Sequence, residues 1–287
     1  MILVGLMAKF DWYSSTLRGS EDAILAELVR GVDLADVRPG RALHGYHRGA
    51  DVVRGDHVLA RVWWGGNPGV HVQSSGPDSH LVAGVIKASW PHHRVTRADA
   101  CEDWHLPGLF DRLHPPLTAY AVDHGIRISQ QGDWIRGEGR TLYLGARSSA
   151  AQLVLYEKGH QIGPPASPDW VRLEARCYPK GDAREDVARW QPEWLFGSTR
   201  WMRGALETIG WDALQAQSIG TVWRAPDDAR ARRALVGQYG AVMARWAHET
   251  GGWDAIGAVL RDAISEAEAL HRHADQPAAA RQAAGVV

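Results

Sequence analysis

The 287-residue sequence contains only two cysteines, Cys101 and Cys177, which stand far apart and show no metal-binding spacing. Neither a disulfide framework nor a zinc site is therefore predicted, and both residues are expected to be small buried side chains. No apolar run approaches the length of a transmembrane helix, and the opening segment MILVGLM is too short for a signal peptide and lacks its basic flank. We expect a soluble, cytoplasmic protein that does not associate with a membrane.

The chain also has a small net charge and few lysines. The 32 Lys and Arg residues almost balance the 33 Asp and Glu residues, which gives a formal net charge of −1. This balance argues against loose polyelectrolyte binding, although it is compatible with a local basic patch. Most of the basic residues are arginines, which suit bidentate contacts with phosphate, but a GC-rich genome would produce the same bias.

The most informative segment is residues 140–178, which contains three short runs in which apolar and polar residues alternate. Successive side chains of a strand point to opposite faces, so each run predicts a strand with one apolar face. In the run QLVLYEK, Tyr156 and Lys158 share the polar face, and in WVRLEAR the same holds for Arg172 and Glu174. A phenol, two cations and a carboxylate thus converge on one surface, as a metal-assisted attack of tyrosine on a phosphodiester requires.

The order of the predicted elements repeats along the chain. Residues 8–90 and 95–200 both predict the order β-α-β-β-β-α, and we interpret them as two similar half-domains that share one sheet-rich core. The predicted fold class is α+β, a mostly antiparallel sheet with helices on one face. Residues 1–200 would form this domain, residues 201–273 a helical segment that includes a helical hairpin, and residues 274–287 a disordered tail.

The two predicted halves differ in their carboxylates. When the halves are aligned, Asp11 corresponds to Asp99, but Gln73 corresponds to Glu174. The first half therefore lacks one of the two carboxylates, and the chemical site is expected in the second half.

The central block resembles the replication initiation factor family, the rolling-circle initiators of staphylococcal-type plasmids and filamentous phages. The family pattern is a Thr-hydrophobe-Tyr-hydrophobe-Gly-Ser-Arg-x-Ser strand, an Arg-Ile-Tyr-Asp/Glu-Lys-Gly strand and a Trp-x-Arg-x-Glu strand. The matching residues are Thr141, Tyr143, Gly145, Arg147, Ser149, Tyr156, Glu157, Lys158, Gly159, Trp170, Arg172 and Glu174. Val154 and Leu155 replace the family's Arg-Ile, so no role is assigned to Val154. Upstream, VTRADACED resembles another strand of the family, and the resemblance spans most of residues 8–260.

Tyr156 is the candidate nucleophile that this resemblance implies, with Lys158 and Arg172 beside the scissile phosphate. A phenol has a pKa near 10, so it needs a polarised phosphorus and stabilising charges in order to attack. The attack yields a phosphotyrosyl intermediate and a free 3′-hydroxyl, and the bond energy retained in the intermediate permits rejoining without ATP. The alternative is that Tyr156 is only an amphipathic strand residue.

Asp99 and Glu174 are the candidate ligands of Mg²⁺ or Mn²⁺, with Asp103 as a third. Such hard cations prefer oxygen ligands and would polarise the scissile phosphate. For each carboxylate, a salt bridge to a neighbouring arginine is the alternative interpretation.

Arg97, Arg147 and Arg176 are expected to bind DNA phosphates through charge-assisted hydrogen bonds, although a solvated polar sheet face explains any one of them equally well. The chain has no His-hydrophobe-His triplet, the metal motif of many nicking enzymes, and the nearest approach is His71-Val72-Gln73. Its 14 tryptophans are a high number, and those near strand ends, Trp63 among them, would either stack unpaired bases or fill the core.

Together these observations predict a rolling-circle replication initiator of a phage or plasmid, which would nick and rejoin one DNA strand at an origin hairpin. The resemblance further implies a homodimer and a recruited host helicase as partners. Two alternatives stay open, namely a relaxase of a conjugative element and a non-catalytic DNA-binding regulator on the same fold.

Overall fold

The structure is a computed structural model that describes residues 7–211, 214, 216–220 and 227–262. The chain divides into two compact units, residues 1–222 and 223–287. We expected the helical segment to begin at residue 201, but the apolar side chains of Met202, Ala205 and Leu206 are buried in the core of the first unit. The sheet domain therefore extends beyond residue 200.

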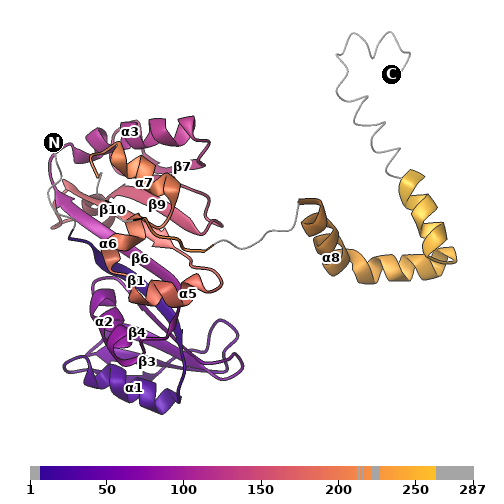
Figure 1. The fold of residues 1–287 in the computed structure, drawn as a ribbon, viewed down its shortest axis with the longest axis horizontal. Coiled ribbons are helices and arrows are strands. Elements are labelled where there is room, and N and C mark those ends of the chain that lie inside the picture. Colours follow the sequence, from indigo (N-terminus) through magenta and orange to yellow (C-terminus); the bar gives the residue numbers. More distant parts are fainter. Residues whose placement is uncertain (1–6, 212–213, 215, 221–226, 263–287) are drawn as a thin grey trace, which may run out of the picture. The chain divides into compact units, whose positions relative to one another are not determined.

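The first unit consists of strands and short helices (Figure 1). In chain order these are β1 (Lys9–Leu17), α1 (Glu21–Arg30), β2 (Asp36–Pro39), β3 (Arg48–Arg54), β4 (His57–Trp64), β5 (Val70–Ser75), α2 (Ser79–Ser89), β6 (Arg94–His105), α3 (Leu109–Asp123), β7 (Ile128–Asp133), β8 (Glu138–Leu144), β9 (Ala151–Glu157), α4 (Lys158–Ile162), β10 (Trp170–Cys177), α5 (Ala183–Asp186), the 3-10 turn η1 (Val187–Arg189), α6 (Pro192–Phe196) and α7 (Arg200–Glu207).

The strands form one ten-stranded sheet in the order β2-β3-β4-β5-β1-β6-β10-β9-β8-β7, and every pairing is antiparallel. Strands β1 to β5 and β6 to β10 follow the same internal order, and the two sets meet where β1 pairs with β6. The predicted α+β class with two similar halves is therefore confirmed. Each half contains one strand more than we expected, because β2 and β7 are short edge strands without an alternating apolar pattern.

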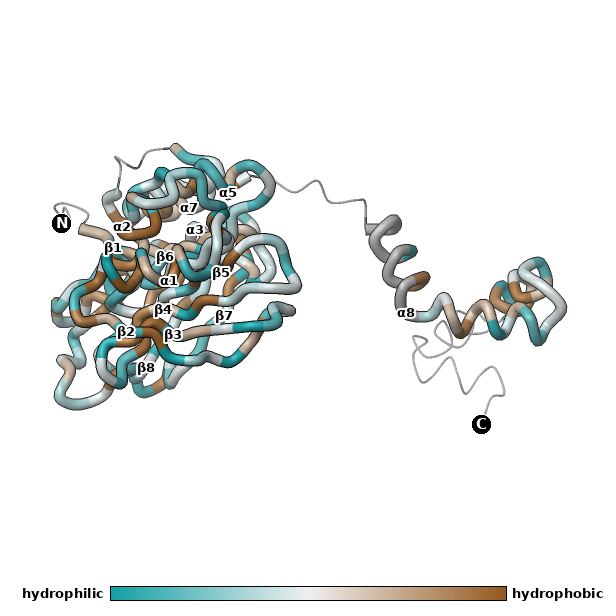
Figure 2. Tube along the Cα trace, turned by 90° about the horizontal axis from the view of Figure 1, so that it is seen from below, coloured by the Kyte–Doolittle hydropathy of each residue, from teal (hydrophilic) through white to brown (hydrophobic). Residues whose placement is uncertain are grey.

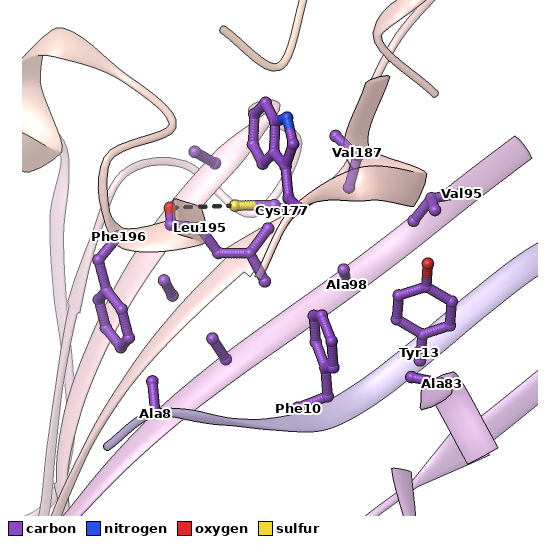
Figure 3. Packing of buried hydrophobic residues seen from close by; sticks show 14 of the residues in the cluster. Ala8, Phe10, Tyr13, Ala83, Val95, Ala98, Cys177, Val187, Leu195 and Phe196 are labelled. Atoms are coloured by element: carbon purple, nitrogen blue, oxygen red, sulfur yellow. Dashed lines mark hydrogen bonds between the residues drawn. The ribbon is translucent and has the colours of Figure 1, made fainter. Parts of the chain in front are cut away.

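One face of the sheet forms the core under the helices, as the alternation predicts. In β10 the buried apolar residues Val171, Leu173, Ala175 and Cys177 share this face. Helix α2 packs on β1 and helix α6 packs on β6 and β10. Figure 3 shows this packing, in which the Cys177 thiol donates to the Leu195 carbonyl oxygen at 3.7 Å. Both cysteines are free and buried, as expected.

Local capping residues set the two ends of helix α1. Helix α1 follows Ser20, whose hydroxyl accepts a hydrogen bond from the backbone N–H of Ala23 at 3.4 Å, and it ends before Gly31. Its apolar stripe contributes Ile24 and Leu28 to the core. Hydrophobic stretches lie along the strands and helices of the first unit, whereas its loops are largely hydrophilic (Figure 2).

The described part of the second unit is helical. Helix α8 (Asp227–Thr250) is followed by helical residues 253–262, and the two are separated by Gly251 and Gly252, whose φ values of +93° and +128° are accessible mainly to glycine. This arrangement agrees with the predicted break between two helices. The end of the predicted hairpin and the tail 274–287 lie outside the described residues. Among the helices that the structure describes, none is long and apolar enough to cross a membrane.

Candidate nucleic-acid site

The three predicted strands of the central block exist as β8, β9 and β10, and they place Tyr156 on the sheet face opposite the helices. In register, Tyr156 of β9 lies between Thr141 of β8 and Arg172 of β10. Lys158 does not extend strand β9 as expected, because the strand ends at Glu157 and Lys158 begins the short helix α4. Its ammonium Nζ nevertheless lies 5.6 Å from the centre of the Tyr156 ring.

Tyr156 is buried, with 7 % of its surface exposed. Burial and, secondly, the negative charge of Glu174 raise the pKa of the Tyr156 phenol well above its usual range, whereas the Arg172 guanidinium acts in the opposite direction. Burial and then the positive charge of Arg172 lower the pKa of Lys158. A protonated phenol thus lies beside a guanidinium and an amine whose affinity for a proton is reduced.

Arg172 is the centre of an ion network that joins three strands. Its Nε and Nη2 donate to the two carboxylate oxygens of Asp103 at 2.7 and 2.8 Å, and its Nη1 donates to Asp11 Oδ1 at 2.7 Å. The Trp170 indole N–H donates to Asp103 at 2.7 Å, and Lys9 Nζ lies 3.1 Å from Asp103.

The contacts that Asp103 makes in this network indicate its role. Burial alone would raise the pKa of Asp103, but the hydrogen bond and charge of Arg172 lower it to about 2. Each oxygen of this carboxylate is engaged by two protein donors, Oδ1 by Arg172 and Trp170 and Oδ2 by Arg172 and Lys9, so no lone pair is left open. Asp103 therefore fixes the Arg172 guanidinium and does not offer the open oxygen that we expected of a third metal ligand.

Asp99 and Glu174 lie on adjoining strands of the same face and are almost completely buried, with 0 % and 3 % of their surfaces exposed. Arg97 binds both oxygens of Asp99, and Arg176 Nη2 donates to Glu174 Oε2 at 2.9 Å. Burial, followed by the nearby charge of Glu174, raises the pKa of Asp99 to about 7 against the opposing effect of Arg97. Asp99 and Glu174 are thus close enough to interact electrostatically.

These two carboxylates meet the minimum donor set for Mg²⁺, which commonly uses one or two protein carboxylates together with substrate phosphate oxygens. A cation there would offset the raised pKa of Asp99, and it would replace the arginines now bound to the carboxylates. Within the part of the chain that the structure describes, no group of three or more His, Cys, Asp or Glu side chains is placed to hold a metal ion. Any such site would therefore depend on phosphate oxygens for its remaining ligands.

A cavity of about 500 Å³ lies on the same sheet face, beside these carboxylates. We name it the arginine cavity, because four of its lining residues are arginines. Its charged and aromatic lining residues are Arg97, Arg127, Arg147, Arg176, Tyr143 and Tyr178. Arg97, Arg147 and Arg176, which were predicted to bind DNA phosphates, therefore lie around one cavity, whereas Arg172, predicted beside the scissile phosphate, does not line it. Arg127 was not predicted, because it precedes an edge strand that has no apolar alternation.

The arginine cavity carries positive charge that the protein itself does not neutralise. Arg97 and Arg176 are paired with buried carboxylates. Arg127 and Arg147 are exposed, and no carboxylate among the described residues pairs with either of them. In addition, the buried Nε of Arg176 has no hydrogen-bond partner. Unsatisfied guanidinium donors around a concave surface are suited to an anion with several oxygens, such as a phosphodiester.

Two other tyrosines line the arginine cavity, whereas Tyr156 does not. The Tyr143 hydroxyl donates to Gln131 Oε1 at 3.0 Å, and the ring centre of Tyr143 lies 5.9 Å from the guanidinium carbon of Arg176. Burial raises the pKa of Tyr178. The sequence placed Tyr156 and the three arginines at one site, but the structure separates the buried phenol from the open cavity.

Comparisons with known proteins add a fold likeness. No family model matches the chain, and no curated protein is similar to it. Among solved structures, it is similar to the rolling circle replication initiator protein from Geobacillus stearothermophilus, with 22 % sequence identity and a TM-score of 0.47. The match covers 64 % of this chain and 78 % of the other. Similarity at this level carries no argument about activity.

Proposed function

We propose that this chain nicks and rejoins single-stranded DNA through a covalent tyrosine intermediate, and that it thereby starts rolling-circle replication of a phage or plasmid. The observation that carries this proposal is that one sheet face holds both the arginine cavity, in which Arg127 and Arg147 have no partner among the described residues, and, apart from that cavity, a phenol close to a guanidinium and an amine. The cavity would bind the phosphates that flank the scissile bond. Because the net charge of the chain is −1, this local patch accounts for DNA binding better than overall charge does.

Tyr156 is the proposed nucleophile. Its phenol oxygen forms a bond to phosphorus while the bond between phosphorus and O3′ breaks, so the fragment that carries the 5′ phosphate remains on the protein as a phosphotyrosine. The departing oxygen becomes a free 3′-hydroxyl that can prime synthesis. The reverse attack by a 3′-hydroxyl restores the phosphodiester and releases the tyrosine.

Arg172 and Lys158 would assist this transfer. Arg172 and Lys158 stabilise the negative charge that develops on the phosphate, and the phenol proton passes to water as the new bond forms. The carboxylates of Asp103 and Asp11 hold the guanidinium in place. Mg²⁺ or Mn²⁺, if held by Asp99 and Glu174, would polarise the phosphate.

Incubation of the protein with a supercoiled plasmid that carries its gene and flanking DNA, in the presence of Mn²⁺, tests this proposal. The wild type is expected to give nicked circles with attached protein, and Tyr156→Phe is expected to give none. Tyr120→Phe is the matched control, because it removes a hydroxyl of the same chemistry from helix α3, outside the arginine cavity, and should leave nicking intact. An intact plasmid that is nevertheless bound by the wild type would instead support a non-catalytic DNA-binding regulator.

A further inference from the structure

A second cavity, of about 470 Å³, lies on the same sheet face but in the first half of the fold. We name it the aromatic cavity, because its lining residues include Trp12, His44, Tyr46, His71, Gln73 and Arg97. The lining residues of the first half come from β1, from β5 and from the loops between β2 and β3 and between β4 and β5. Strand β1 pairs with β6, and Ser14 of this cavity lies opposite Arg97 of the arginine cavity in that pairing, so the two cavities adjoin.

Flat rings are stacked along one side of the aromatic cavity. The rings of Tyr46 and His71 are stacked, with centres 6.0 Å apart and planes inclined by 22°. On its other side, His71 stacks on Trp63 at 5.9 Å and 24°. Trp63 is buried and its indole N–H donates to the Arg41 carbonyl oxygen, whereas Tyr46 is only half-buried. The stack therefore begins in the core and ends at Tyr46 on the surface of the cavity.

Polar contacts hold the residues that line the aromatic cavity in place. Thr16 Oγ1 lies 3.3 Å from His71 Nδ1, and the Asn67 side-chain amide donates to the His44 carbonyl oxygen at 3.0 Å. His44 adopts a φ of +56°, a left-handed conformation that is uncommon for a residue other than glycine. Its ring meets Trp63 edge to face at 5.1 Å. These contacts fix the positions of the rings, and a surface held in place by its own contacts lowers the entropic cost of binding.

Charge distinguishes the two cavities. Burial, followed by the charge of His44, lowers the pKa of His71 to about 4, so the stacked imidazole is neutral near pH 7. Arg97 lines both cavities, and its guanidinium carbon lies 4.0 Å from the centre of the Trp12 ring. A ligand that extends from one cavity to the other would therefore pass Arg97, with its anionic groups towards the second half and a flat uncharged group towards the first.

We propose that the aromatic cavity binds an unpaired nucleobase of the DNA strand by stacking on Tyr46. This inference rests on the proposed function, because it takes the phosphates of the same strand to lie in the arginine cavity. A stacked base fits the neutral flat rings, and every base offers such a face, so the site would favour single-stranded DNA without selecting a sequence.

The test measures affinities of the full-length chain for two fluorescent 12-nucleotide strands, oligo-dT and a strand of the same length that consists only of abasic tetrahydrofuran units. All proteins carry Tyr156→Phe so that no strand is cleaved. We expect the Tyr46→Ala variant to bind oligo-dT roughly 5- to 100-fold more weakly, the range for one lost stacked base, and to bind the abasic strand as before. Tyr46→Phe keeps the ring and should behave as the parent protein does.

The proposal is overturned if Tyr46→Ala weakens the binding of both strands alike, or of neither. The proposed function, by contrast, fails if the parent protein binds neither strand. Photocrosslinking of an oligo-dT strand that carries one 5-iododeoxyuridine provides a second measurement on the folded parent protein. Mass spectrometry should locate the crosslink at Trp12, Tyr46 or His71, and a crosslink confined to tyrosines of the arginine cavity would contradict the proposal.

Discussion

The two halves of the sheet have the same strand order but opposite surface chemistry on the face opposite the core helices of the first unit. The second half carries arginines, tyrosines and buried carboxylates, and its cavity has guanidinium groups without protein partners. The first half carries stacked rings around a histidine whose pKa is low. Under the proposed function, the two halves of this repeated scaffold would divide the recognition of one DNA strand, with phosphates bound in one half and a base in the other.

The largest effect that would sharpen this comparison concerns the ion network of the second half. Arg172→Met leaves Asp103 and Asp11 without their main partner, so we expect the free energy of unfolding to fall by about 3 kcal/mol. The control is Arg61→Met in the first half, because Arg61 is exposed and lies 4.0 Å from Asp51. It should change stability by less than about 0.5 kcal/mol. Urea unfolding measures both, and equal losses would break the contrast.

The next effect concerns pH and belongs to the first half. Because the pKa of His71 is lowered to about 4 in the folded chain, the unfolded chain binds a proton first as the pH falls from about 6.5 to 4. The folded state therefore loses stability across that window, by on the order of 2 kcal/mol. His71→Phe should remove this part of the dependence, while other titrating groups cancel in the comparison. His47→Phe, at an exposed position in the loop between β2 and β3, is the control and should follow the wild type.

A smaller effect concerns the unpaired arginines of the second half. Arg127→Gln and Arg147→Gln should each weaken binding of a single-stranded oligonucleotide by roughly tenfold. Each should also reduce the slope of log affinity against log salt concentration by about 0.7, the value for one phosphate contact. Fluorescence anisotropy at several salt concentrations measures both quantities. Arg38→Gln, on an exposed edge strand of the first half, should change neither quantity. A similar loss in that variant would show that the arginine cavity is not the site of phosphate binding.

Sequence alternation predicted the parts of the fold that bury an apolar face. Strands β8, β9 and β10 and helix α1 were predicted within a few residues, because their apolar residues recur with the period of the element. The edge strands β2 and β7 were missed because their exposed residues, such as the run ISQQGD, carry no such pattern. Their pairing with β3 and β8 is a tertiary effect that overrides local propensity.

The sequence predicted which residues belong to the candidate site, but it did not predict the contacts between their side chains. Parity along the strands correctly placed Arg172, Glu174 and Arg176 on one face. It could not show that Arg172 reaches Asp11, which is 161 residues distant in the sequence, or that both oxygens of Asp103 would be engaged. Such contacts depend on which strands become neighbours. The strand order, in turn, depends on the packing of the whole sheet and cannot be deduced from one strand.

The most direct test of the account is to identify the residue that becomes linked to DNA. The full chain would be incubated with Mn²⁺ and a suicide oligonucleotide whose nicked product diffuses away, which traps the covalent intermediate for proteolysis and mass spectrometry. The account predicts one adduct, on Tyr156 beside Arg172. An adduct on Tyr143 or Tyr178, the two tyrosines that line the arginine cavity, would contradict it.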